Sequence, residues 1–94
     1  MFIDDFVWLP QAVEKLDRKH DLSQDEVEGI FFNRPYFRFV ERGWRKGEDV
    51  YSALGRAESG RYVIVFFIHK SDGSALVMSA RDMDRKERKI YGKR

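Results

Sequence analysis

The chain has 94 residues, of which 43% are hydrophobic and 15% aromatic, so it carries enough apolar surface for one folded domain. It contains no cysteine, which excludes disulfides, thiolate metal sites and cysteine nucleophiles. No stretch approaches the roughly 18 consecutive apolar residues of a membrane span, and the first residues are acidic where a secretory signal is basic. We therefore expect a cytoplasmic protein with no membrane partner.

The net charge of +2 is distributed unevenly along the chain. Residues 1–35 hold 4 basic and 8 acidic side chains, residues 36–80 hold 7 and 5, and residues 81–94 hold 7 and 3. Charge segregated in this way gives a molecule a preferred side for a polyanion. A solvated charged tail has the same composition, so composition alone leaves both interpretations open.

Two helices are predicted in the N-terminal third, after residues 1–8, which suit a short strand or an extended arm. Pro10 suits the first turn of a helix, and the apolar residues of Gln11–His20 recur at helical spacing, so this helix ends near the histidine. Ser23–Glu26 has the form of a capping box, in which a hydroxyl and a carboxylate bond free amides at a helix start. The second helix is stopped by Asn33–Pro35.

From residue 36 the apolar period changes to two, which predicts a β-sheet. Strands are expected over Tyr36–Arg42, Asp49–Ala57, Tyr62–Ile68 and Ala75–Arg81. The third is continuously apolar, as in a central strand; periodicity also allows a buried helix, but length and β-branching favour a strand. Asp72-Gly73 predicts a hairpin with a type I′ turn, because both residues tolerate positive φ.

A basic helix is predicted at the C-terminus, with Asp84 as its cap. Its inward stripe combines Met83, Glu87, Ile90 and Tyr91, and its opposite face is cationic: Arg85, Lys86, Arg88 and Lys89. Four cations on one face can neutralise phosphates without reading sequence, although a solvated helix face looks the same. Residues 1–94 therefore predict a single α+β domain with a small antiparallel β-sheet, two N-terminal helices and a basic C-terminal helix.

Glu87 is the unusual member of the inward stripe, because an unpaired carboxylate is costly to bury. It needs a partner, and Arg81 is the nearest candidate in sequence. A structural ion pair and a catalytic carboxylate are equally compatible with this pattern.

Three further side chains are candidates for phosphate chemistry. His20 ends the first predicted helix beside Lys19, where a helix C-terminus favours the charged imidazolium that can act as an acid; most such histidines are only caps. Arg56 and Arg81 end two predicted strands. If those ends lie on the same side of the sheet, their guanidinium groups can clamp one phosphate and stabilise a phosphorane-like transition state.

Tyr36, Arg38 and Arg42 alternate on one predicted strand, where they can add base stacking and phosphate contacts. Ordinary surface charge explains each of these cations equally well. No metal or cofactor is expected, because the two histidines lie far apart and outside any ligand spacing. There is also no glycine-rich phosphate loop or nucleophile elbow.

A set of short motifs runs through nearly the whole chain: Trp8-x-Pro10, Lys19-His20, Asn33-x-Pro35, Ala53-Leu54-Gly55-Arg56, Gly60-Arg61 and Ser79–Tyr91 (SARDMDRKERKIY). The set resembles the BrnT family, toxins of bacterial type II toxin–antitoxin pairs. This resemblance implies a RelE-like fold, ribonuclease activity that inhibits translation, and a BrnA-like antitoxin that binds DNA. A homodimer or a toxin–antitoxin heterotetramer is compatible with it.

Carried over by position, the family pattern covers Lys19, His20, Arg56, Ser79, Arg81, Glu87 and Tyr91. The implied reaction is metal-independent RNA cleavage, in which a ribose 2′-hydroxyl attacks its own phosphate. Arg56 and Arg81 are the expected clamp, with His20 or Glu87 for proton transfer. Tyr91 is expected to orient the substrate or stack on it. The residues expected to bind the RNA backbone are Lys19, Arg38, Arg42, Lys86 and Lys89.

The chain also departs from the family pattern. Ala12 and Leu16 stand where the family commonly has Lys and Asn, and Asp21 stands where Gly commonly follows the histidine. If the missing polar groups assist catalysis, the protein is a weak nuclease or an inactive relative. Two alternatives therefore stay open: a non-catalytic interaction module that docks an acidic protein partner, and sequence-independent DNA binding.

Overall fold

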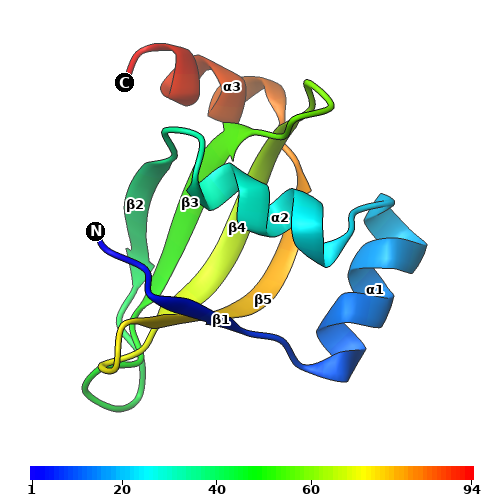
Figure 1. Ribbon diagram of the computed structural model, residues 1–94. Coiled ribbons are helices and arrows are strands. Elements are labelled where there is room, and N and C mark those ends of the chain that lie inside the picture. The colour runs from blue at the N-terminus through cyan, green and yellow to red at the C-terminus, as the bar shows by residue number, and fades with distance from the viewer.

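A computed structural model describes residues 1–94, which form three helices and a five-stranded sheet (Figure 1). The helices are α1 (Pro10–His20), α2 (Gln24–Phe31) and α3 (Arg85–Gly92). The strands are β1 (Asp5–Val7), β2 (Tyr36–Glu41), β3 (Val50–Arg56), β4 (Tyr62–His69) and β5 (Ser74–Asp82). The predicted α+β class is confirmed. No helix has the length and apolar character that crossing a membrane requires.

The strands lie in the order β1-β5-β4-β3-β2. Strands β2 to β5 form an antiparallel meander, as the short predicted turns require. Strand β1 instead pairs in parallel with the first residues of β5. The expected antiparallel sheet is therefore corrected to a mostly antiparallel one. The direction of β1 could not be predicted from a short turn, because both N-terminal helices and three strands lie between β1 and β5 in the sequence.

The two faces of the sheet are covered differently. On the helical face, Leu16 of α1 and Ile30 of α2 pack against Val65 and Phe67 of β4. On the opposite face, which we call the α3 face, residues of α3 pack against Leu54 and other apolar residues at one end of the sheet. Figure 1 shows α2 crossing in front of the strands and α3 at their upper end. The remainder of the α3 face is left uncovered by helices.

The ends of the first two helices agree with the sequence. The Ser23 hydroxyl accepts a hydrogen bond from the Glu26 amide at 3.1 Å, and the Glu26 carboxylate accepts one from the Ser23 amide at 3.3 Å. This is the predicted capping box. Helix α1 ends at His20 because Asp21 adopts a left-handed φ of 51°, a conformation that glycine enters with less strain.

The hairpin between β4 and β5 differs from the prediction. Only Gly73 of the predicted pair has a positive φ, +92°, so the type I′ assignment was wrong. The Gly73 amide donates to the Lys70 carbonyl at 3.0 Å, and the Lys70 amide donates to the Ser74 carbonyl at 2.8 Å. These bonds form a three-residue loop that needs one left-handed glycine. The Asp72 carboxylate stabilises it by accepting from the Ser74 amide at 2.9 Å.

Gly55 on β3 permits the close approach of α2 to the sheet. A Cβ at this position would lie 2.6 Å from Cγ2 of Ile30, well inside van der Waals contact.

Overpacking of this kind costs about 1–3 kcal/mol, so Gly55→Ala is expected to lower the free energy of unfolding by that amount in urea titrations. The matched control is Gly29→Ala in α2, where a Cβ meets nothing within 4 Å; stability is expected to rise by about 0.5–1 kcal/mol. Equal effects of the two substitutions would contradict the close packing.

Candidate functional site

Arg56 and Arg81 lie on the same face and at the same end of the sheet. Arg56 is opposite Tyr62, and Arg81 is opposite Ile64. Because Tyr62 and Ile64 are two residues apart on β4, all four side chains point to the α3 face. The condition for a shared phosphate clamp, that both strand ends lie on the same side of the sheet, is therefore met.

The two guanidinium groups nevertheless point to different places. Arg56 reaches outward, where its Nη2 donates to the Gly60 carbonyl at 3.2 Å and its Cζ lies 4.6 Å from the centre of the Tyr62 ring. Arg81 leans the other way along β4, with its Cζ 5.6 Å from the centre of the Phe66 ring. Tyr62 and Phe66 are four residues apart, or about 13 Å along a strand. The expectation of a single clamp on one phosphate is corrected to two separate cationic positions.

The first position is an open cavity at the end of the sheet, which we call the Arg56 cavity. It has a volume of about 370 Å³, and the cations on its walls come from β3 and from the C-terminal part of the chain. Arg56 forms no ion pair, and Cζ of Arg88 lies 4.1 Å from the centre of the Tyr62 ring. Guanidinium groups without a carboxylate partner suit a phosphate, and here they stack on the half-buried ring of Tyr62. The lining residues are Arg56, Tyr62, Arg88, Tyr91, Gly92 and Arg94.

The second position is built around an ion pair between β5 and α3. Arg81 donates two parallel hydrogen bonds to the Glu87 carboxylate, from Nη1 at 2.8 Å and from Nη2 at 2.9 Å. Oε1 of Glu87 also accepts from the Asp84 amide at 2.9 Å, and the Asp84 carboxylate accepts from the Glu87 amide at 2.8 Å. Glu87 therefore closes the capping box of α3 and fixes Arg81 at the same time.

These contacts decide between the two roles left open for Glu87. Its hydrogen bonds from Arg81 hold the pKa of Glu87 below the usual glutamate range, and the same bonds raise the pKa of Arg81. A carboxylate that is ionised and has both oxygens occupied is poorly suited to proton transfer. Arg81 keeps its Nε–H and one Nη2–H free, because only three of its five N–H groups have partners.

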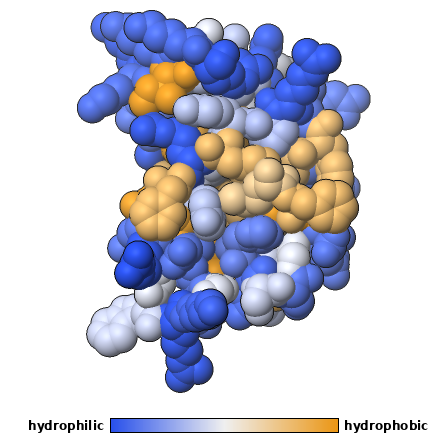
Figure 2. Space-filling view, turned by 90° about the vertical axis from the view of Figure 1, so that its left-hand side faces the viewer, coloured by the Kyte–Doolittle hydropathy of each residue, from blue (hydrophilic) through white to orange (hydrophobic).

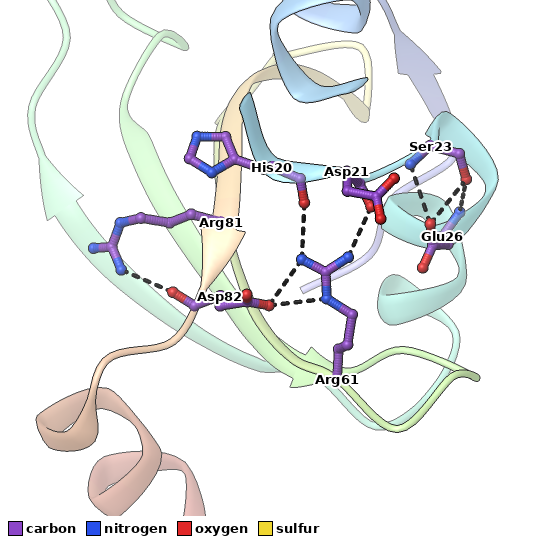
Figure 3. Close-up of polar contacts among 7 residues, drawn as sticks. All are labelled: His20, Asp21, Ser23, Glu26, Arg61, Arg81 and Asp82. Atoms are coloured by element: carbon purple, nitrogen blue, oxygen red, sulfur yellow. Dashed lines mark hydrogen bonds and ion pairs between the residues drawn. The ribbon is translucent and has the colours of Figure 1, made fainter. Parts of the chain in front are cut away.

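His20 lies in a narrow groove between α1 and β5. The groove is lined by Ala12 and Leu16 of α1 and by Met78 and Ser79 of β5. Figure 3 shows the imidazole of His20 and the side chain of Arg81 extending in the same direction from α1 and β5. Ala12 and Leu16, two departures from the family pattern, make the wall next to His20 apolar.

Arg61 connects the two elements that carry His20 and Arg81 (Figure 3). Its Nη2 donates to the His20 carbonyl at 2.8 Å, and its Nη1 donates to the Asp21 carbonyl at 2.7 Å. Its Nε donates to the Asp82 carboxylate at 3.0 Å, which raises the pKa of Arg61. One cation thus bonds the free carbonyls at the end of α1 and the residue that follows Arg81. Sequence analysis predicted no role for Arg61, and the Gly60-Arg61 motif was its only signal.

Tyr91 does not fit the role expected from the sequence. Its side chain is only 6% exposed, it packs with Leu54 and Ile64, and Cζ of Arg94 lies 3.7 Å from the centre of its ring. A substrate base therefore has little free ring surface to stack on. Tyr62 lines the same cavity, where Arg56 and Arg88 stack on its ring; the sequence analysis missed it because its strand looked uniformly apolar.

The residues expected to bind RNA lie on several elements and do not form one cluster. Lys19 at the end of α1 and Lys86 and Lys89 on α3 are exposed. Arg38 is exposed opposite Ser52. Arg42 lies beyond the end of β2, after an irregularity in the pairing between residues 39 and 41, so it does not continue the predicted alternation with Arg38.

Comparison with known proteins bears on the family and the fold of this chain. The family model described as "Ribonuclease toxin, BrnT, of type II toxin-antitoxin system" matches residues 8–87. The crystal structure of the Brucella abortus ribonuclease toxin BrnT is similar to this chain, with a TM-score of 0.59 and 14% sequence identity. The similarity covers 86% of this chain and 97% of that chain. Among curated proteins no match was found.

The match along most of the chain defines the class of protein as the ribonuclease toxins of type II toxin–antitoxin systems. The chain belongs to the BrnT family of that class. Membership implies RNA as the substrate and an antitoxin as the partner.

Loss of the Arg81–Glu87 pair is expected to change stability in a pH-dependent way. Because the pKa of folded Glu87 is depressed, its contribution is fully present above about pH 4.3, the unfolded value, and is lost as the pH falls through the lower folded pKa. Glu87→Gln should therefore reduce the free energy of unfolding by about 1–3 kcal/mol at pH 7. Urea titrations at a series of pH values should show the difference from wild type shrinking below about pH 4. A difference that does not change with pH would contradict this assignment.

Arg61→Gln is expected to loosen the last turn of α1. The amides of Asp21 and Leu22, which donate to the carbonyls of Asp17 and Leu16, should exchange with solvent about tenfold faster or more, because the neighbouring carbonyls lose their cation. Hydrogen exchange followed by NMR measures this change. Arg18→Gln, which removes only an exposed ion pair with Glu14 at 4.0 Å, is the control and should leave these rates unchanged. Equal rates in both variants would refute the role given to Arg61.

Proposed function

We propose that this chain is a metal-independent endoribonuclease toxin that inhibits translation by cleaving RNA beside His20 and Arg81. The observation that carries the proposal is the set of bonds from Arg61, which fixes the end of α1 against the end of β5. These bonds support a site in which the imidazole of His20 and the partly exposed guanidinium of Arg81 act together. Family membership supplies RNA as the class of substrate.

An RNA strand fits across the α3 face. Arg81 contacts the phosphate that reacts, and the Arg56 cavity holds a more distant phosphate. Lys86 and Lys89, both exposed on α3, contact the backbone between these positions. None of these cations reads a base edge, so the interface by itself supplies affinity more than sequence selectivity.

The reaction needs a stabilised phosphorane and a protonated leaving group. The 2′-hydroxyl oxygen bonds to the adjacent phosphorus, the bond from phosphorus to the 5′ oxygen breaks, and a 2′,3′-cyclic phosphate forms. The free N–H groups of Arg81 stabilise the extra negative charge on the phosphoryl oxygens. His20 donates a proton to the departing 5′ oxygen, and the proton of the 2′-hydroxyl passes to water. Glu87 acts as a positioning residue, because it fixes the plane of the Arg81 guanidinium.

Purified protein is expected to cleave RNA in the presence of EDTA and to leave 2′,3′-cyclic phosphate ends. His20→Ala and Arg81→Lys should each lower the cleavage rate by about 100-fold or more, because each removes a group that acts in the transition state. Gel analysis of labelled RNA measures the rates, and melting curves check that each variant is folded. Arg18→Ala, on the exposed side of α1, is the matched control and should cleave as the wild type does.

Two results would defeat the proposal. One is the absence of cleavage by folded wild-type protein, which would favour the non-catalytic interaction module. The other is undiminished cleavage by both variants. Translation is tested separately by amino-acid incorporation after induced expression, which should fall with the wild type and not with His20→Ala.

A further inference from the structure

Strand β2 leaves one edge of the sheet uncovered. It pairs only with β3, so the backbone groups that point outward from Tyr36–Glu41 have no hydrogen-bond partner in the chain. The opposite edge is different, because β1 pairs with the start of β5 and α1 packs against β5. An unpaired edge strand is a template on which another strand can form.

The helical face of β2 borders an exposed apolar groove. Phe37 lines this groove together with Phe2, Phe31 and Phe32, and its volume is about 380 Å³. Phe2 and Phe32 are each 76% exposed, and Phe39, the next residue of β2 on the same face, is 57% exposed. Figure 2 shows apolar side chains gathered in a band across this side of the molecule, with hydrophilic surface above and below. Contiguous apolar surface of this kind marks an interaction site.

The other face of β2 carries Arg38 along residues 36–39 and Glu41 at its last residue, and the loop beyond the strand is rich in cations. Arg38 points to the α3 face, is exposed and forms no ion pair. Beyond the strand, the loop 42–47 surrounds a cavity of about 320 Å³ whose lining includes Arg42, Arg45 and Lys46. An occupant of this edge therefore meets apolar groups on one side and positive charge on the other side and at one end.

We propose that the free edge of β2 binds an extended segment of the antitoxin in which apolar residues alternate with acidic ones. The proposal rests on the toxin function, because it requires an antitoxin partner. Successive side chains of an added strand point to opposite faces, so alternate residues lie beside Phe37 and Phe39 and the others beside Arg38. The pairing irregularity near Val40 confines regular main-chain bonding to residues 36–39.

A second copy of this chain fits the same edge less well. Two-fold antiparallel pairing of residues 36–39 would bring Arg38 of each copy opposite or diagonal to Arg38 of the other on the same face. Like charges at this spacing repel, and the nearest carboxylate of β2, Glu41, lies beyond the pairing irregularity and outside residues 36–39. The charge pattern therefore selects an acidic partner over self-association.

The test uses the full chain and the protein encoded by the adjacent reading frame. Phe39→Glu is expected to weaken the dissociation constant, measured by calorimetry, by about 30-fold or more, because it places a charge in the apolar contact. Leu9→Glu, at a residue 42% exposed next to the opposite edge, is the matched control and should change it by less than about twofold. Hydrogen exchange should show slower exchange of outward-facing amides in residues 36–39 when the antitoxin is bound.

Each other outcome overturns the proposal. Absence of binding, equal affinities of Phe39→Glu and wild type, or unchanged exchange in β2 would each do so. A dimer of the chain alone that Phe39→Glu dissociates in sedimentation experiments would assign the edge to a second copy. RNA cleavage measured without antitoxin distinguishes the two proposals, because Phe39→Glu should cleave as the wild type does. If wild-type protein cleaves no RNA, the nuclease assignment fails. The dissociation constants for the antitoxin still decide whether the β2 edge is its binding site.

Discussion

The bidentate ion pair between Arg81 and Glu87 is the contact on which the α3 face depends. Glu87 bonds the Asp84 amide as well, so one carboxylate both starts α3 and attaches it to β5. Helix α3 then covers only the end of the sheet where its apolar residues meet Leu54 and Ile64. The rest of the face stays free of helices, with cations along its borders.

The arginines differ in how many of their N–H groups have partners within the chain and in what those partners are. Arg61 serves the fold, because it bonds two helix-end carbonyls and the Asp82 carboxylate. Arg56, Arg38 and Arg88 form no ion pairs within the chain. Arg81 is intermediate, because Glu87 orients it while two of its N–H groups remain available. Fixing some cations and leaving others uncompensated lets one basic domain have both a stable fold and an anion-binding surface.

The proposed RNA surface and the proposed antitoxin surface meet at β2. Arg38 belongs to the α3 face, whereas Phe37 and Phe39 belong to the apolar groove beside α2. A partner strand bound at this edge would extend the sheet and place its acidic residues next to the RNA-binding cations. Such binding offers a physical route to inhibition, since carboxylates there lower the positive potential that attracts RNA.

The sequence by itself determined the local structure: the capping box of α2, the Asp84 cap of α3, the Pro10 start of α1, and the strands from Tyr36 to Arg81 all follow from spacing and side-chain chemistry. It also identified Glu87 as a carboxylate in need of Arg81, because a charge in an apolar stripe requires a partner. Only the tertiary structure decided the parallel pairing of β1, the burial of Tyr91, the separation of Arg56 from Arg81 and the linking role of Arg61. These features depend on contacts between residues distant in sequence, and side-chain periodicity carries information only about near neighbours along the chain.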